Sequence, residues 1–214
     1  MASRIKIVAL SAILGFALTC VAQPKGYPHI TVIVRHPAEM PHAVLNGAEA
    51  VTMHVFDKAG VSVHWVNCPQ SDGAFLNPGC DDALAPVDLV VHVLPRAQSA
   101  ANSVFGVSFV DAGGGVYADI FLDRMQRLHE QNPSISFSRL LGYVVAHELG
   151  HLLLGEHSHS SMGLMQTPWR PEQLEKLGRG NLFFNSNEAA YLRTRAAMLD
   201  AQSMPLTVAA ESGN

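Results

Sequence analysis

The sequence predicts an α/β protein in which a mixed, twisted β-sheet packs on one long helix and is followed by C-terminal helices. Three observations predict this class. β-Branched runs recur over the first 122 residues, a glycine-rich turn joins two of them closely, and residues 136–154 are apolar at helical spacing. At 214 residues, with 48% hydrophobic and 15% charged side chains, the chain has enough apolar material for one domain with a real core.

The first half of the chain combines strands with one helix. Residues 29–35 and 61–66 predict strands because they are rich in β-branched side chains and are bounded by proline or glycine. Residues 42–59 carry apolar side chains at helical spacing and are followed by Gly60, which predicts a helix with a glycine cap. Residues 87–94 are nearly all apolar, which predicts a strand buried on both faces.

The next segment predicts a hairpin and a short helix. Residues 104–110 and 116–122 have strand composition, and the turn at 111–115 between them contains three consecutive glycines. Strands joined so closely pair in antiparallel fashion, so we expect a mixed sheet. A helix is predicted at 123–131.

The longest predicted helix covers residues 136–154. Ser136 or Ser138 can cap its first turn, and Gly155 suits its end. Beyond Gly155 we expect a loop and then two helices, at 171–177 and 187–201.

The N-terminus has the pattern of a secretory signal peptide. Basic residues at its start precede an apolar run at 7–18 and then small residues. The run is shorter than the ~20 residues of a membrane-spanning helix. An uncleaved anchor, or a lipoprotein modified at Cys20, is the alternative. We therefore divide the chain into a signal peptide at 1–22, one domain at 23–202 and a flexible tail at 203–214.

The charge that remains after cleavage argues against nucleic acid as a partner. The full sequence has 14 Lys and Arg against 18 Asp and Glu. Loss of residues 1–22 removes Arg4 and Lys6 and no acid, which leaves 12 basic and 18 acidic side chains, a net charge of −6. Phosphate binding needs a basic patch, and no run of like charge indicates a membrane surface. We expect a monomeric, secreted or periplasmic protein with no membrane partner.

Cys68 and Cys80 predict one disulfide. They are the two cysteines left after signal cleavage, and the segment between them is rich in Pro, Asn, Gly and Asp. Exported proteins form disulfides in oxidising compartments. The alternative, a metal-binding pair, lacks the short spacing of the cysteines in zinc knuckles.

The segment from His147 to Met165 holds most of the chemistry-bearing residues. His147 and His151 lie one helical turn apart, at ~6 Å, so both rings can reach one Zn²⁺ ion. Glu148 is rotated by about 100° from His147 and can instead contact a water on the metal, where it would act as general base. The apolar neighbours predict that this helix is buried, where unpaired histidine and glutamate would be costly.

A catalytic zinc site usually has three protein ligands. The sequence offers two further histidines close by, His157 and His159. No glutamate follows on a helix at the distance that a thermolysin-like site needs. Three later glutamates are therefore only weak alternatives for the third ligand: Glu172, Glu175 and Glu188.

The stretch HELGHLLLGEH, residues 147–157, resembles the metzincin signature H-E-x-x-H-x-x-G-x-x-H, and Met165 in SMGLM resembles the methionine of the metzincin Met-turn. A longer likeness, over most of residues 60–170, is to a poorly characterised group of secreted bacterial proteins. These share HELGHLLLG, S-H-S and G-I-M, a W-x-x-C…C segment at 65–80 and a GGGVYA strand at 113–118. The resemblances imply a zincin-like fold, a zinc cofactor and a hydrophobic base under the metal.

The third ligand differs between the two likenesses. The metzincin signature has its glycine seven residues after the first histidine, where this chain has Leu154, and Gly155 follows one residue later. Signature spacing makes His157 the third ligand, whereas the S-H-S motif points to His159. Because a longer helix needs a longer return path, we favour His159 and keep His157 as the alternative.

Metzincins bind extended peptide along an edge strand that precedes the site helix. The resemblance places this strand at 116–122 or at its hairpin partner. Gly113–Gly115 could admit a substrate backbone or could simply form a tight turn. Trp169 and Arg170 are candidates for a specificity pocket or for packing.

We therefore expect a secreted zinc-dependent endopeptidase that acts on peptide or protein substrates. His147, His151 and either His159 or His157 would bind zinc, and Glu148 would be the base. Two rivals use the same residues: a zinc hydrolase of a non-protein amide, and an exported protein that binds metal without catalysis. A base beside the first ligand argues against the second rival. Mn or Fe could also occupy such a site.

Overall fold

The computed structural model describes residues 26–77, 80, 88–97, 104–111 and 113–203. The strands are β1 (His29–Pro37), β2 (Ser62–Ser71), β3 (Ala74–Phe75), β4 (Leu89–Leu94), β5 (Gly106–Asp111) and β6 (Gly114–Phe121). The helices are α1 (His42–Ala59), α2 (Leu122–Gln131), α3 (Phe137–Leu154), α4 (Pro171–Gly178) and α5 (Ser186–Ser203). The predicted signal peptide at 1–22 lies outside the described residues, as does the predicted tail except for Ser203, which ends α5.

The strands form one mixed sheet in the order β3-β2-β1-β4-β6-β5. β1 pairs in parallel with β2 and β4, β4 pairs in parallel with β6, and β5 pairs antiparallel with β6. The predicted α/β class with a mixed sheet is therefore confirmed. Of the two alternatives for the edge strand, the structure excludes residues 116–122, because β6 has β4 on one side and β5 on the other. Its hairpin partner β5 is the last strand of the described sheet.

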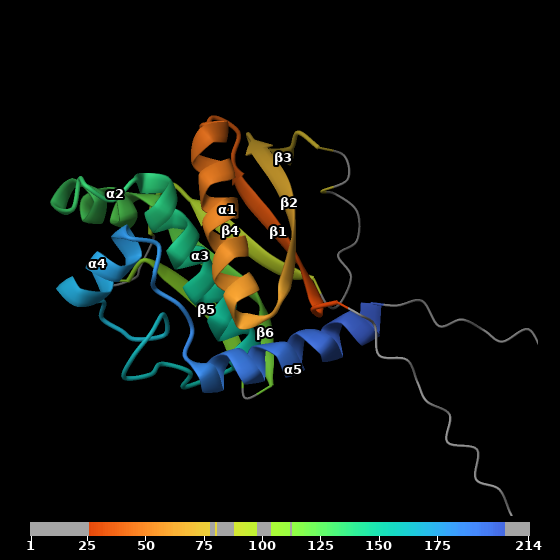
Figure 1. The fold of residues 1–214 in the computed structure, drawn as a ribbon. Coiled ribbons are helices and arrows are strands. Elements are labelled where there is room, and N and C mark those ends of the chain that lie inside the picture. Colours follow the sequence, from red (N-terminus) through yellow and green to blue (C-terminus); the bar gives the residue numbers. More distant parts are fainter. Residues whose placement is uncertain (1–25, 78–79, 81–87, 98–103, 112, 204–214) are drawn as a thin grey trace, which may run out of the picture.

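Helices α1 and α3 lie side by side on one face of the sheet, and α5 packs against α1, α3 and β1 (Figure 1). The contact of α1 with α3 is close because Gly142 has no side chain. A Cβ on Gly142 would lie 2.6 Å from the carbonyl oxygen of Ala48. The hydroxyl of Thr52 donates to the carbonyl of Gly142 at 3.0 Å across the same contact. This packing holds α3 against both the sheet and α1, and α3 is buried along most of its length.

The boundaries of the helices follow their local sequence signals. α1 covers the predicted residues 42–59, and Gly60 ends it in the left-handed conformation at φ 78°. The predicted strand at 61–66 is too short, because parallel pairing with β1 carries β2 on to Ser71, with Cys68 opposite Arg35. The sequence did not predict the two-residue strand β3, because β3 is recognised as a strand only from its pairing with β2.

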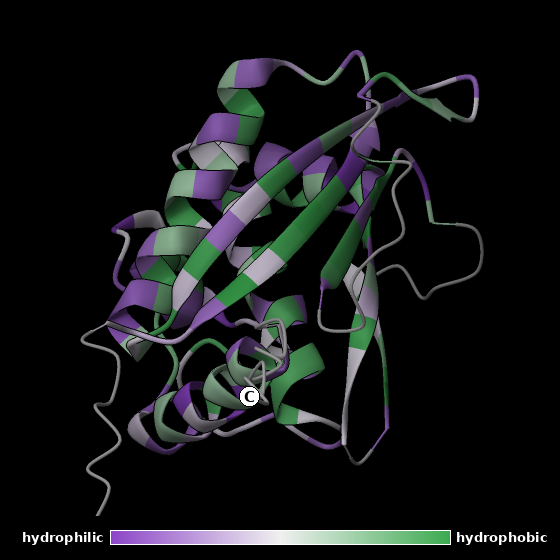
Figure 2. Cartoon of the chain, turned by 90° about the vertical axis from the view of Figure 1, so that its right-hand side faces the viewer, coloured by the Kyte–Doolittle hydropathy of each residue, from purple (hydrophilic) through white to green (hydrophobic). Residues whose placement is uncertain are grey.

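Cys68 and Cys80 form a disulfide. Both are buried, and together with Ile33 they form a small hydrophobic cluster apart from the main core. Figure 2 views the molecule with strands in front of the helices, and hydrophobic residues are frequent along the central strands. Among the described helices, none has the length and hydrophobicity that a bilayer-crossing segment needs.

Candidate metal centre

Helix α3 carries the candidate site because its sequence makes it helical and buried at once. The Ser136 hydroxyl accepts from the backbone N–H of Arg139 and so caps the first turn. The helix itself carries leucine, valine and alanine side chains that pack into the core on all sides. As a result, His147 and Glu148 are only 9% and 5% exposed. A helix so enclosed holds polar side chains in fixed positions, which is what a metal centre needs.

Three histidines converge at the C-terminal half of α3. Nε2 of His151 lies 3.1 Å from Nε2 of His147 and 3.0 Å from Nε2 of His159. Possible ligand atoms of the three residues all lie within 4.8 Å of one another. A tetrahedral zinc with Zn–N bonds of ~2.0–2.1 Å holds its nitrogens ~3.3–3.4 Å apart, so the spacing suits one ion. His147, His151 and His159 can therefore hold a metal.

The other ring nitrogens of two of these histidines are already occupied. His147 Nδ1 lies 2.9 Å from the carbonyl oxygen of Leu164, which can only accept, so Nδ1 carries the proton and Nε2 keeps its lone pair. His151 Nδ1 lies 2.7 Å from the Ser158 hydroxyl, which leaves its Nε2 toward the other rings. Such outer bonds orient metal-ligating imidazoles, so the cluster has the chemistry of a ligand set.

Loss of solvation, greatest for His147 and His151, favours the neutral form of the rings, which is the form that binds metal. Loss of solvation lowers the pKa of His147 to about 4. Loss of solvation, followed by the neighbouring His147 and His159, lowers the pKa of His151 to about 3. His159 is the most exposed of the three, and partial loss of solvation lowers its pKa as well. At neutral pH the cluster therefore offers lone pairs without first having to release protons.

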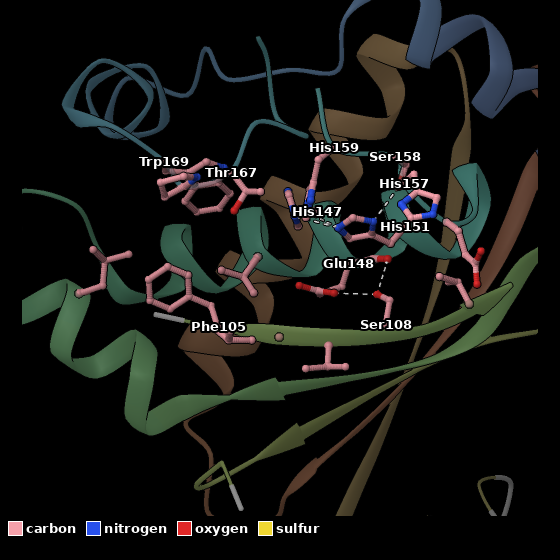
Figure 3. Close-up of a pocket in the computed structure, with 18 of the residues that line it drawn as sticks. Phe105, Ser108, His147, Glu148, His151, His157, Ser158, His159, Thr167 and Trp169 are labelled. Carbon is pink, nitrogen blue, oxygen red and sulfur yellow. Dashed lines mark hydrogen bonds between the residues drawn. The ribbon is translucent and has the colours of Figure 1, made fainter. Parts of the chain in front are cut away.

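The loop after α3 brings His159 to the cluster and leaves His157 outside it. The backbone N–H of Glu156 donates to the carbonyl of Asp111 at 3.2 Å, and that of Ser160 donates to Met165 at 3.1 Å, so both ends of the loop are held. His157 is exposed, with a left-handed backbone at φ 57°, and lies to the side of the other three rings (Figure 3).

Glu148 lies beside the cluster and faces strand β5 (Figure 3). The Ser108 hydroxyl donates to Oε2 of Glu148 at 2.6 Å. Burial raises the pKa of the Glu148 carboxyl to about 7, and the hydrogen bond from Ser108 opposes this shift. A carboxyl with a pKa near neutrality can both take up and release a proton at physiological pH.

A cleft of about 950 Å³ opens onto the three histidines and Glu148. One wall is the segment that leads into β5 and β5 itself, and the other comes from α3 and the loops after it. Phe105 stacks on Trp169 with ring centroids 6.4 Å apart, and Trp169 meets the edge of His147 at 5.9 Å. One end of the cleft is therefore apolar, with the predicted pocket residue Trp169 lining it, whereas Arg170 does not line it.

Met165 is fully buried below the site helix. A Cβ on Gly150 of α3 would lie 2.6 Å from its sulfur, so the methionine fills the space that this glycine leaves. The neighbouring Leu164 supplies the carbonyl that holds His147. The segment around Met165 thus supports the helix that carries the histidines.

The remaining candidates from the sequence lie elsewhere. Glu172 forms an exposed ion pair with a lysine on α4, and Glu175 forms one with the arginine that follows α4. Glu188 accepts from the backbone N–H of Asn185 at the start of α5. Gly114, at φ 103°, admits the backbone of α3, because a Cβ there would lie 2.6 Å from the carbonyl oxygen of Leu152. This contact favours the turn interpretation of the glycines over substrate approach.

Sequence reasoning missed Ser108 and Phe105, and it assigned no role to Ser158. Ser158 belongs to the S-H-S motif, whose first serine could have been recognised as a partner for a ligand histidine. Ser108 reaches Glu148 across 40 residues of sequence. No local pattern marks that pairing, since it depends on the position of β5 beside α3.

No protein-family model matches the chain, and no curated protein matches it. The solved structures that align with it include the following two. An archaemetzincin from Methanopyrus kandleri is 16% identical, with a TM-score of 0.49 over 80% of this chain and 97% of that chain. A metalloproteinase-II from Bacteroides fragilis is 12% identical, with a TM-score of 0.49 over 79% of this chain and 54% of that chain.

Proposed function

We propose that this chain is an exported, zinc-dependent endopeptidase. His147, His151 and His159 hold the zinc, and Glu148 is the general base. The observation that carries the proposal is the convergence of three neutral imidazoles, with Nε2 atoms 3.0 and 3.1 Å apart, beside a buried carboxyl in an open cleft. A site that only stores metal has no need for a buried carboxyl at its side.

The chain supplies most of the chemistry through Glu148. Zinc at the three imidazoles would acidify a water and polarise the carbonyl to be attacked. The Glu148 carboxylate takes the proton of that water and then delivers it to the leaving nitrogen. Its pKa of about 7 suits both transfers. His147 and His151 stay neutral throughout, because their pKa values lie well below neutrality.

A peptide fits the surroundings of the site better than a small amide does. β5 ends the described sheet beside the cleft, and the free side of an end strand can pair with an extended backbone. The apolar end of the cleft, at Phe105 and Trp169, suits a hydrophobic side chain of such a substrate. The disulfide at Cys68–Cys80 is consistent with an oxidising compartment.

The test uses oxidised protein comprising residues 23–214 with zinc bound. An unfolded protein and a degenerate peptide library serve as substrates, with and without a chelator, for the wild type and for Glu148→Gln. We expect cleavage by the wild type, loss on chelation, recovery on zinc addition, and a roughly 10²- to 10⁴-fold lower kcat in Glu148→Gln.

His157→Ala is the matched control, because His157 borders the cleft without joining the cluster. It should cleave at a rate close to that of the wild type. One zinc bound per chain without any cleavage of peptides would overturn the peptidase proposal and favour a hydrolase of another amide. Cleavage that survives chelation would overturn the role of zinc.

A further inference from the structure

The Glu148 carboxyl rests on strand β5. The Ser108 hydroxyl lies 2.6 Å from Oε2 of Glu148 and 3.0 Å from its backbone carbonyl oxygen. The single hydroxyl proton can serve only one of these acceptors at a time. Ser108 is thus held against both the backbone and the side chain of the same glutamate, which restricts the directions that the carboxyl can take.

Gly106 provides the space for this carboxyl. A Cβ on Gly106 would lie 2.6 Å from Oε1 of Glu148 and 2.7 Å from its Cδ and Cγ atoms. Gly106 is not among the glycines with positive φ, so its backbone does not require glycine. Space for the Glu148 side chain is therefore the reason that the structure gives for a glycine at this place.

The two residues act from one face of a supported strand. Gly106 and Ser108 are two apart, so their Cα substituents point to the same side of β5. They pair with Ile120 and Ala118 of β6, which are both fully buried. A strand backed by buried residues of its neighbour can hold a side chain in place more firmly than a loop can.

We infer that Gly106 and Ser108 form a seat that fixes the orientation of the Glu148 carboxyl. Gly106 leaves the space and Ser108 donates the hydrogen bond. Both are positioning residues that act through Glu148, and the inference rests on the proposed role of Glu148 as the base. The strand that borders the substrate cleft thereby also sets the direction of the base.

The first test measures kcat and KM for Ser108→Ala and Ser108→Thr with zinc bound. Loss of the hydroxyl should lower kcat roughly 10- to 100-fold, the effect of one hydrogen bond to a charged group, with KM and zinc content unchanged. Ser108→Thr keeps the hydroxyl and should restore most of kcat. In a Glu148→Gln background, Ser108→Ala should lower kcat no further. An equal loss in both backgrounds would overturn the inference.

The second test does not depend on activity. Gly106→Ala should lower the Tm of the wild type, because the new methyl group collides with the Glu148 carboxyl. It should leave the Tm of Glu148→Ala unchanged, because the shortened side chain frees that space. Gly26→Ala is the matched control, since nothing lies within 4 Å of its added Cβ.

The two tests separate the inference from the proposed function. If the wild type cleaves no peptide, the proposed function fails, and the Tm pair still decides whether the seat exists. The same fall in Tm from Gly106→Ala in both backgrounds would mean that its cost does not come from Glu148, and the seat would be rejected.

Discussion

Nε2 of His151 lies 3.0 Å from Nε2 of His159, although the helix end at Gly155 and a left-handed residue at His157 separate them. The loop therefore passes over His157 and returns with His159 directed at the helix. In the described structure His159, and not His157, therefore joins His147 and His151 in one cluster.

His159→Ala should weaken zinc binding by well over the ~10- to 100-fold that loss of a supporting hydrogen bond costs at such sites, because it removes a ligand itself. His157→Ala should leave zinc affinity unchanged, since the His157 side chain is not part of the cluster. Competition against a chromophoric chelator measures both affinities. The reverse order of effects would make His157 the ligand.

Glu148→Gln should stabilise the zinc-free protein in a pH-dependent way. Burial raises the folded-state pKa of Glu148 to about 7 from 4.5, so its contribution to stability is present below pH 4.5 and is lost as pH rises through 7. The amide does not titrate. The difference in free energy of unfolding should therefore grow between pH 5 and pH 8 in favour of the variant, by up to ~3 kcal/mol.

The contribution of His147 and His151 to stability changes with pH in the opposite direction to that of Glu148. It cancels when the wild type is compared with Glu148→Gln. The folded-state pKa values of His147 and His151, about 4 and about 3, lie below 6.5, so their contribution is present above pH 6.5 and falls as the pH drops. The wild type and Glu148→Gln both contain these histidines, so this contribution is the same in the two proteins. Glu175→Gln, at an exposed glutamate on α4, is the control for charge alone. A wild-type-to-variant difference that is equal at pH 5 and pH 8 would contradict the prediction.

Local patterns predicted the elements whose signals lie within a few residues. α1 has the predicted bounds because helical periodicity and a glycine cap coincide at Gly60. The extension of β2 beyond residue 66 and the existence of β3 depend on pairing with other strands, which no window of sequence contains. The order of the strands in the sheet has the same origin, so the sequence leaves open whether residues 116–122 or their hairpin partner form the edge strand.

The site divides in the same way. His147, Glu148 and His151 are marked by helical spacing alone, because one turn brings the two histidines together. The path of the loop determines whether His157 or His159 lies in the cluster with the two helix histidines. That path depends on hydrogen bonds to Asp111 and Met165 at the ends of the loop. The partners of Glu148 come from β5, 40 residues away, and only the packed fold brings them near.

The disulfide between Cys68 and Cys80 should contribute stability without affecting the metal centre. It closes a loop with a sequence separation of 12, for which loop-closure entropy predicts about 3 kcal/mol. The double replacement Cys68→Ala with Cys80→Ala should lower the free energy of unfolding by about this amount. Zinc affinity should not change, because three strands separate β2 from β5 in the sheet. Reduction should destabilise only the wild type; an equal effect on the double variant would exclude the disulfide as the cause.

The serines on either side of His159 should differ in their effect on zinc. Ser158 bonds Nδ1 of His151 at 2.7 Å, whereas the Ser160 hydroxyl donates to the carbonyl of Met162. Ser158→Ala should therefore weaken zinc binding roughly 10- to 100-fold, because the ring of His151 loses the partner that orients it. Ser160→Ala is the matched control and should bind zinc as the wild type does. Equal losses in the two variants would show that the serines act through the shape of the loop, and equal affinities would show that His151 needs no such partner.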